Sequence, residues 1–164
     1  MNRVMVVGGP GSGKSTMAIA LGEITGLPVF HMDQIHYRSG WAERELDDKI
    51  SMANAVEARN RWIFEGGLSS TYVNRSARAD TVIWLDLPLS VRLARIMKRR
   101  IRFNATTRPD LPDNCPERLD PSFQGYMYRT RHAGRARIPH IIHDAPHQPV
   151  PHLRPRTRPA CPPA

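Results

Sequence analysis

The sequence predicts an α/β fold in which helices cover both faces of a parallel sheet. Two observations support this prediction. Short apolar runs alternate along the chain with longer segments whose apolar residues recur at helical spacing. In addition, a glycine-rich segment at residues 8–16 joins the first apolar run directly to the first helical segment. The length of 164 residues is that of a single domain, so we expect one domain with its own core.

The predicted strands are continuous apolar runs, which are typical of strands buried on both faces of a parallel sheet. Each run is followed by a glycine, an acidic residue or a polar segment. The clearest of them, Thr-Val-Ile-Trp-Leu, is rich in the branched and aromatic residues that favour strands. The four runs lie at residues 4–7, 27–31, 62–64 and 81–85.

The predicted helices follow from apolar residues that recur at spacings of three and four. The first helix begins near Lys14 and ends at Gly26, because glycine commonly follows the last turn of a helix. The second covers residues 43–60, the third begins at Leu89, and a further helix begins near Pro121. In the first three helices, the residues predicted to face the core are Met17, Ala20, Leu21, Ile24, Leu46, Ile50, Ala53, Val56, Leu89, Leu93, Ile96, Met97 and Ile101.

The C-terminal segment differs in composition from the rest of the chain. Residues 139–164 hold eight prolines and four histidines, and proline interrupts both helices and central strands. We therefore predict a domain at residues 1–144 and an extended or disordered tail at residues 145–164. At most one short strand is expected there, near residues 138–143 or 150–153.

Composition also excludes several classes of protein. The apolar runs are far shorter than the roughly 20 residues that cross a bilayer, and the N-terminus lacks the pattern of a signal peptide. The 2 cysteines are too few and too far apart for a disulfide framework or a zinc site. We therefore expect a cytoplasmic protein without a membrane partner.

The formal net charge of +9 is concentrated in one part of the chain. Residues 92–137 hold twelve Lys and Arg residues against four Asp and Glu residues. A basic block of this kind attracts phosphate groups. Charge alone does not distinguish a nucleotide from a nucleic acid or an acidic surface.

The glycine-rich segment satisfies the pattern G-x-x-x-x-G-K-[ST], and it lies between a predicted strand and a predicted helix as that pattern requires. Its glycines let successive backbone N–H groups point at phosphate oxygens, and the helix N-terminus adds a partial positive charge. Lys14 can reach the β- and γ-phosphates, and the Ser15 hydroxyl can bind Mg²⁺. We therefore predict that ATP and Mg²⁺ bind at Gly8, Gly9, Pro10, Gly11, Ser12, Gly13, Lys14, Ser15 and Thr16.

A site of this type normally includes a carboxylate near the Mg²⁺, at the end of a neighbouring strand. Asp33, Glu65 and Asp86 each follow a predicted strand, and all three would lie at the carboxyl edge of the sheet. By pattern alone, Asp86 is the best candidate, because four apolar residues directly precede it. The residues by themselves leave the choice open.

With these residues in place, the chain resembles the adenylate-kinase-like branch of P-loop kinases, which includes shikimate and gluconate kinases. It is most similar to the small proteins called DNA topology modulation (FlaR-like) proteins. The resemblance extends over about residues 1–137. It depends on residues 8–16, His31-Met32-Asp33 with Gly40-Trp41, Trp62-Ile63-Phe64-Glu65-Gly66, residues 79–88 and Cys115-Pro116-Glu117-Arg118.

The resemblance implies a three-layer α/β sandwich with a parallel sheet in the strand order 2-3-1-4-5. The sheet would have five strands, or four if the proline-rich C-terminus supplies none, since that segment has no convincing counterpart of the family's last strand and helix. An arginine-rich lid is implied at about residues 102–120. By the match with adenylate kinases, Arg95 would lie against the adenine and Arg99 would contact phosphates.

The resemblance also bears on the choice of acid. In adenylate kinases the acid at the position of Glu65 orients Mg²⁺ through water, and in shikimate kinases the acid at the position of Asp33 does so. We therefore favour Asp33 and Glu65 over Asp86, which leaves Ser15, Asp33 and Glu65 as the predicted metal site.

These observations predict an ATP-dependent kinase that transfers the γ-phosphate to a nucleotide or another hydroxylated metabolite. The predicted catalytic residues are Lys14, Asp33, Arg99 and Arg118, with Asp33 orienting the acceptor hydroxyl. The predicted acceptor site consists of Asp33, His36, Trp41, Glu65, Gly66 and Gly67.

Two other functions remain open at this stage. The basic block at residues 92–137 also fits a nucleotide-binding regulatory protein that contacts nucleic acid without kinase activity. No recognised DNA- or RNA-binding motif accompanies that block, however, and a kinase lid accounts for the same arginines. A nucleotide-binding but catalytically idle protein is the third possibility.

Overall fold

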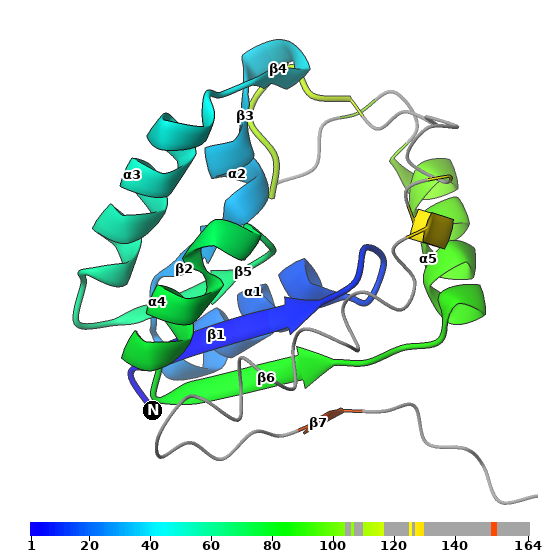
Figure 1. The fold of residues 1–164 in the computed structure, drawn as a ribbon. Coiled ribbons are helices and arrows are strands. Elements are labelled where there is room, and N and C mark those ends of the chain that lie inside the picture. Colours follow the sequence, from blue (N-terminus) through cyan, green and yellow to red (C-terminus); the bar gives the residue numbers. More distant parts are fainter. Residues whose placement is uncertain (104–105, 107–109, 117–124, 126, 130–151, 154–164) are drawn as a thin grey trace, which may run out of the picture.

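A parallel sheet lies between α1 (Lys14–Thr25) on one face and α3 (Leu46–Glu57) and α4 (Tyr72–Arg78) on the other (Figure 1). The structure is a computed structural model, and it describes residues 1–103, 106, 110–116, 125, 127–129 and 152–153. The arrangement confirms the predicted α/β fold with helices on both faces of the sheet.

The central part of the sheet has the strand order β2-β5-β1-β6, and all neighbouring pairs are parallel. This is the order predicted for the first four strands. Residues 4–7 of the central strand β1 are at most 2% exposed. The strands are β1 (Arg3–Gly8), β2 (Val29–His31), β5 (Trp62–Glu65) and β6 (Thr81–Leu85).

A two-residue strand, β7 (His152–Leu153), pairs in parallel with the outer edge of β6. It falls within residues 150–153, where one short strand was predicted. It is too short to confirm a full fifth strand of the predicted order, and the rest of the C-terminal segment lies outside the described residues.

Side chains on the strands alternate between the two faces, as the period of a strand requires. Val4, Val6 and Ile63 pack with Ala18 of α1 on one face. On the other face, Met5, Val7, Trp62, Phe64 and Trp84 pack with Met32, Ile35, Ala53 and Val56. Met32 and Ile35 belong to α2 (Met32–His36), and Ala53 and Val56 belong to α3. The molecule therefore has three layers.

Several short elements were not predicted from the sequence. They include α2 and α4, each of which follows a strand of the sheet. A small antiparallel hairpin was also missed. It consists of β3 (Tyr37–Arg38), the 3-10 turn η1 (Ser39–Trp41) and β4 (Ala42–Glu43). A second 3-10 turn, η2 (Ser69–Thr71), directly precedes α4.

The predicted helices are present, but five of the residues assigned to their buried faces are exposed. The predictions were wrong for Ala20, Ile24 (82% exposed), Leu46 (53%), Met97 (46%) and Ile101 (79%). Ile24 and Leu46 lie at the ends of α1 and α3, and Met97 and Ile101 in the C-terminal half of α5 (Leu89–Arg102). Helical spacing identifies a face, but it does not tell where along the helix the packed neighbours end.

The predicted ends of the helices agree with the structure in part. α1 ends at Gly26, whose N–H donates to the carbonyl of Gly22. α3 is shorter than the predicted 43–60. Residues 127–129 are helical, as is Gly125, within the helix predicted to begin near Pro121, whose start lies outside the described residues. None of the helices in the described ranges combines the length and apolar character that crossing a membrane requires.

Asp80 joins the start of β1 to β6, and we expect its removal to destabilise the fold. Its Oδ2 accepts hydrogen bonds from the N–H groups of Asn2 (2.7 Å) and Arg3 (3.0 Å), and its Oδ1 accepts one from the Thr81 hydroxyl. Burial acts to raise the pKa of Asp80, but these donors together lower it below its usual value. Replacing Asp80 by alanine should lower the free energy of unfolding by about 1–2 kcal/mol at pH 7.

The pH dependence of this effect has a definite sign. A carboxylate whose pKa is lowered by folding stabilises the protein above the unfolded-state pKa of 3.8, and this contribution is lost as the pH falls through the folded-state pKa. The difference in denaturation midpoint between wild type and Asp80→Ala should therefore shrink as acid is added. A difference that stays constant down to about pH 2 would contradict the assignment.

Candidate active site

The glycine-rich segment forms the connection between β1 and α1, at the carboxyl end of the central strand (Figure 1). Gly13 precedes the helix with φ +96°, a left-handed conformation that favours glycine. No side chain caps the N-terminus of α1, so its first N–H groups are available to an anion. The segment predicted to hold phosphate therefore lies at a helix N-terminus, where backbone N–H groups can bind an anion, and phosphate binding there stays a prediction.

Lys14 lies over this loop. Its Nζ donates to the carbonyl oxygen of Gly9, which is five residues earlier in the chain and 3.3 Å away. The ammonium group has three donors, so two remain for other acceptors. The side chain thus carries a positive charge back across the residues predicted to hold the phosphates.

Ser15, Glu65 and His31 form a chain of polar contacts beside the loop. The Ser15 hydroxyl donates to Glu65 Oε1 (3.0 Å), and His31 Nδ1 lies 2.8 Å from the same oxygen. His31 and Glu65 are directly opposite each other at the ends of β2 and β5, and both are buried. Glu65 is thereby held at the edge of the sheet, next to the start of α1.

The oxygens of Ser15 and Glu65 are the kind of ligands that Mg²⁺ takes. Within the ranges that the structure describes, no three His, Cys, Asp or Glu side chains lie close enough together to hold a metal by themselves. A small number of protein oxygens agrees with Mg²⁺, which usually keeps several waters and binds substrate phosphates. The donor set therefore fits the predicted ion.

Asp33, predicted as a metal or acceptor residue, is the second residue of α2, two positions beyond His31. It is half-buried, and its charge acts on His36 and Tyr37. The pKa of His36 is lowered, first by burial and then by the Lys49 ammonium group, although Glu43 and Asp33 oppose this. The imidazole is therefore neutral at pH 7, with its Nε2 3.1 Å from Glu43 Oε1.

His36 and Trp41, both predicted to line the acceptor site, each contact the ring of Tyr37, which lies between them in the sequence. The rings of His36 and Tyr37 meet edge to face with centroids 4.7 Å apart, and those of Tyr37 and Trp41 with centroids 5.1 Å apart. Glu43 also forms an ion pair with the buried Lys49. These contacts fix the β3–β4 hairpin to α2 and α3.

The far part of the predicted lid segment lies against this hairpin (Figure 1). The indole Nε1 of Trp41 donates to the carbonyl oxygen of Pro116 (3.1 Å), and its backbone N–H donates to Cys115 Sγ (3.3 Å). The N–H of Gly40 donates to the carbonyl of Asp113 at 3.4 Å. Residues 113–116 therefore contact the β3–β4 hairpin, which carries the predicted acceptor residue Trp41.

The first half of α5 packs against the glycine-rich segment at residues 8–16. Arg95 Nη1 donates to the carbonyl oxygen of Ser12 (2.9 Å), so the arginine predicted to lie near the adenine does lie beside the loop. Arg92 is buried, and its guanidinium group lies against Gly9. Arg99 lies one turn beyond Arg95 and is half-buried, whereas Arg118 is outside the described residues.

The segment after β5 is held in an unusual conformation. Gly66 has φ +99°, and a Cβ there would lie only 2.6 Å from the Cβ of Met32. The N–H of Gly66 donates to the carbonyl of Val6 (3.3 Å), and its carbonyl accepts from Arg75 Nη1 (3.0 Å). Gly67 follows as an exposed residue.

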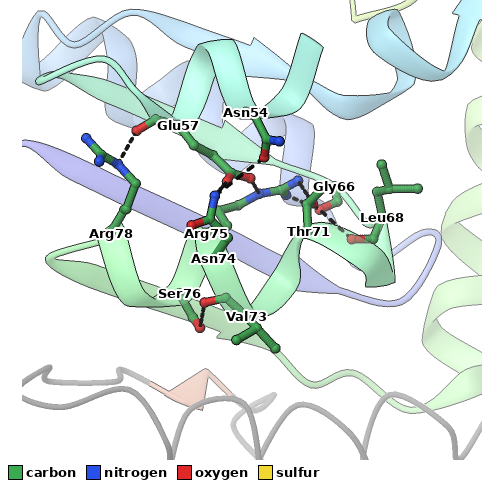
Figure 2. Close-up of polar contacts among 10 residues, drawn as sticks. All are labelled: Asn54, Glu57, Gly66, Leu68, Thr71, Val73, Asn74, Arg75, Ser76 and Arg78. Atoms are coloured by element: carbon green, nitrogen blue, oxygen red, sulfur yellow. Dashed lines mark hydrogen bonds and ion pairs between the residues drawn. The ribbon is translucent and has the colours of Figure 1, made fainter. Parts of the chain in front are cut away.

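Arg75 and Glu57 are site-adjacent residues that sequence reasoning missed. Figure 2 shows the Arg75 guanidinium group between Glu57, Gly66 and Thr71. Both charged side chains are completely buried. Burial raises the pKa of Glu57, against the opposing effect of Arg75. The only sequence signal was indirect: Glu57 lies four residues after Ala53 and so interrupts the predicted apolar face of α3.

Comparisons with known proteins agree with this geometry at the level of the fold. A shikimate kinase from Acinetobacter baumannii superposes with a TM-score of 0.56, at 16% sequence identity, over 91% of this chain and 83% of that one. The chain therefore shares the fold of this shikimate kinase. Shikimate kinases from Aquifex aeolicus (TM-score 0.51, 15% identity) and Bacteroides thetaiotaomicron (TM-score 0.52, 16% identity) match over 90% of this chain and 85% of theirs.

The fold shared with shikimate kinases agrees with the broader part of the predicted resemblance. No protein-family model and no curated protein matches the sequence, so the narrower resemblance to DNA topology modulation proteins is not confirmed. At such low identity the structural neighbours indicate the fold and leave the acceptor to be argued from the residues of this chain.

Proposed function

We propose that the protein is an ATP-dependent kinase that phosphorylates a hydroxyl group of a nucleotide or another small metabolite. The observation that carries the proposal is the contact of Ser15 with Glu65 beside the uncapped N-terminus of α1. It supports the proposal because the predicted phosphate loop, Lys14 and two oxygens that could bind a cation then lie at one edge of the sheet. That edge is where ligands bind in open α/β folds.

The glycine-rich segment indicates where the nucleotide would lie. ATP would lie on residues 8–16, with Arg95 beside it and with Lys14, Arg99 and Arg118 facing the transferred phosphoryl group. Ser15, Glu65 and Asp33 would hold Mg²⁺, which, when bound, neutralises charge that develops on the phosphate oxygens. Lys14 supplies the same kind of stabilisation from the protein, because its ammonium group is fixed over the loop.

The acceptor would enter between the β3–β4 hairpin and the segment after β5. Asp33 would accept a hydrogen bond from the acceptor hydroxyl and orient its oxygen toward the γ-phosphorus. His36, Trp41, Gly66 and Gly67 would line the remainder of this site. In the transfer, the acceptor oxygen–phosphorus bond forms as the bond to the ADP leaving oxygen breaks, and the hydroxyl proton departs to Asp33 or water.

The first test is ADP release from ATP and Mg²⁺ in the presence of nucleoside monophosphates, nucleosides and hydroxy-acid metabolites, each supplied separately. We expect one class of acceptor to stimulate ADP release and to become phosphorylated, and Lys14→Ala to abolish the stimulation. Tight ATP binding without stimulation by any acceptor would contradict the proposal and favour the regulatory or idle alternative.

Glu65 should set the requirement for Mg²⁺. Glu65→Gln keeps the size of the side chain but removes its charge, so the Mg²⁺ concentration at half-maximal activity should rise by about 10- to 100-fold. The measurement is a Mg²⁺ titration of ADP release with the best acceptor. Glu23→Gln, on the exposed surface of α1, is the matched control and should leave the titration unchanged. An unchanged midpoint in Glu65→Gln would remove Glu65 from the metal site.

The nucleic-acid alternative depends on the same basic residues. In the described part of α5, Arg92 is buried against Gly9, and the exposed Arg95 donates to the carbonyl of Ser12, so both contact the loop at residues 8–16, which favours the kinase. Counterion release makes electrostatic DNA binding strongly dependent on salt. DNA binding that persists at physiological salt, together with failure of every acceptor, would reverse this preference.

A further inference from the structure

Arg75 contacts the proposed active site through the main-chain carbonyl of Gly66. Its guanidinium group makes three hydrogen bonds in three directions: Nε to Glu57 Oε1 (3.1 Å), Nη1 to the carbonyl of Gly66 (3.0 Å) and Nη2 to the Thr71 hydroxyl (2.8 Å). It also lies 3.9 Å from the centre of the Phe64 ring. Figure 2 shows how this one group joins α3, α4 and the end of β5.

Stability alone does not account for a buried ion pair at this place. Removing two charges from water costs several kcal/mol, and well-packed apolar residues of similar size often serve stability equally well. What apolar residues lack is a donor for the buried carbonyl of Gly66. The planar guanidinium group, by contrast, donates in fixed directions and holds its acceptors in a defined geometry.

The position of the Gly66 carbonyl has a consequence for Gly67. The carbonyl of Gly66 and the N–H of Gly67 belong to one peptide unit, and the structure has no cis peptide bonds. In a trans unit the two groups point in opposite directions. Because Arg75 holds the carbonyl toward the interior, the N–H of the exposed Gly67 points outward, and it donates to no residue in the described part of the chain.

We propose that Arg75, fixed by Glu57, is a positioning residue that orients the peptide between Gly66 and Gly67 and thereby presents the Gly67 N–H to an oxygen of the acceptor. The proposal depends on the proposed kinase function for the identity of that oxygen. The same contact also fixes the main chain directly after Glu65, whose carboxylate meets Ser15. Arg75 itself, being completely buried, contacts neither ATP nor acceptor.

The test must separate positioning from folding, because removing Arg75 alone leaves Glu57 buried without its partner. The double variant Arg75→Met, Glu57→Leu removes both charges together and fills similar volume, so we expect it to fold. Arg75→Lys is the conservative variant, since lysine keeps the charge but cannot donate along three fixed directions. Arg59→Met is the matched control, because Arg59 also lies over an aromatic ring, 5.0 Å from the centre of Phe30, on an exposed part of the chain.

Two measurements are compared across these variants. The first is hydrogen–deuterium exchange of the peptide that covers residues 65–71, with residues 14–25 of α1 as internal reference. The second is steady-state kinetics with the best acceptor from the panel, together with the dissociation constant of ATP and Mg²⁺. Circular dichroism and thermal unfolding show whether each variant is folded.

In the double variant, exchange over residues 65–71 should increase about tenfold or more while residues 14–25 are unaffected. The kcat/KM for the acceptor should fall by about 10- to 100-fold, because small displacements of a binding group cost this much. The dissociation constant of ATP should stay within about twofold, since the loop residues that hold it do not touch Arg75. Arg75→Lys should restore only part of the acceptor kinetics, and Arg59→Met should resemble wild type.

A folded double variant with wild-type exchange and wild-type kcat/KM would overturn the proposal and leave Arg75 a structural residue. An equal loss of ATP binding and acceptor kinetics would overturn it as well, because the effect would then be general. If wild type phosphorylates no acceptor, the proposed function fails. Exchange then decides separately whether Arg75 holds the peptide: unchanged exchange rejects that role, and increased exchange supports it.

Discussion

Replacing Lys14 by alanine should lower kcat for phosphoryl transfer by about 100- to 1000-fold, which corresponds to roughly 3–4 kcal/mol of transition-state stabilisation. The physical reason is the position of its ammonium group, which the contact with the Gly9 carbonyl holds over the phosphate cradle. In that place its charge acts on the transferred group without reorganisation of solvent. The measurement is the rate of acceptor phosphorylation at saturating ATP and Mg²⁺.

The control for this substitution is Lys98→Ala, which removes a lysine from the exposed surface of α5. It should change kcat by less than about twofold and stability by no more than about 0.5 kcal/mol. Lys14→Ala should also remain folded, because Lys14 is half-buried and forms a single long hydrogen bond. Equal losses of rate in both variants would show that overall positive charge, rather than the position of Lys14, drives the reaction.

Replacing Glu57 by alanine should lower the free energy of unfolding by about 3–5 kcal/mol, the largest stability effect that we expect in this molecule. The substitution leaves the Arg75 guanidinium group completely buried without a counter-charge. It also removes the acceptor of a hydrogen bond from Asn74 Nδ2 to Glu57 Oε2 (2.6 Å). Urea denaturation followed by tryptophan fluorescence measures the loss.

Glu23→Ala, on the exposed surface of α1, provides the comparison and should change stability by no more than about 0.5 kcal/mol. The double variant Arg75→Met, Glu57→Leu should recover most of the stability that Glu57→Ala loses, because no unpaired charge remains. If Glu57→Ala cost less than about 1 kcal/mol, water would have to reach the guanidinium group, and the description of this pair as fully buried would be wrong.

The sequence predicted best those features that depend on residues close together in the chain. Residues 8–16 must curve and end at a helix N-terminus whatever surrounds them, so the loop was recognised together with its strand and helix. Continuous apolar runs identified the four main strands, and the resemblance supplied their order. Ser15 and Glu65, predicted together as metal ligands, do lie in contact.

The features that were missed depend on neighbours far along the chain. α4 has a completely buried arginine where a short helix would normally present an apolar residue, so apolar spacing could not reveal it. The role of Arg75 requires Glu57 and Gly66, and nothing in a single sequence connects the three. Leu46 was placed in the core because spacing shows a direction but not the extent of the neighbouring sheet.

The position of β1 at the centre of the sheet has a consequence for the synthesis of the protein. This strand is made before both of its partners, β5 and β6, which lie far downstream and end at Glu65 and Leu85. At about 5–20 residues per second, roughly 4 to 15 s pass between the synthesis of β1 and that of its second partner. Throughout that interval the apolar residues of β1 have no complete sheet to enter. The nascent protein is therefore exposed to aggregation until β6 has been made.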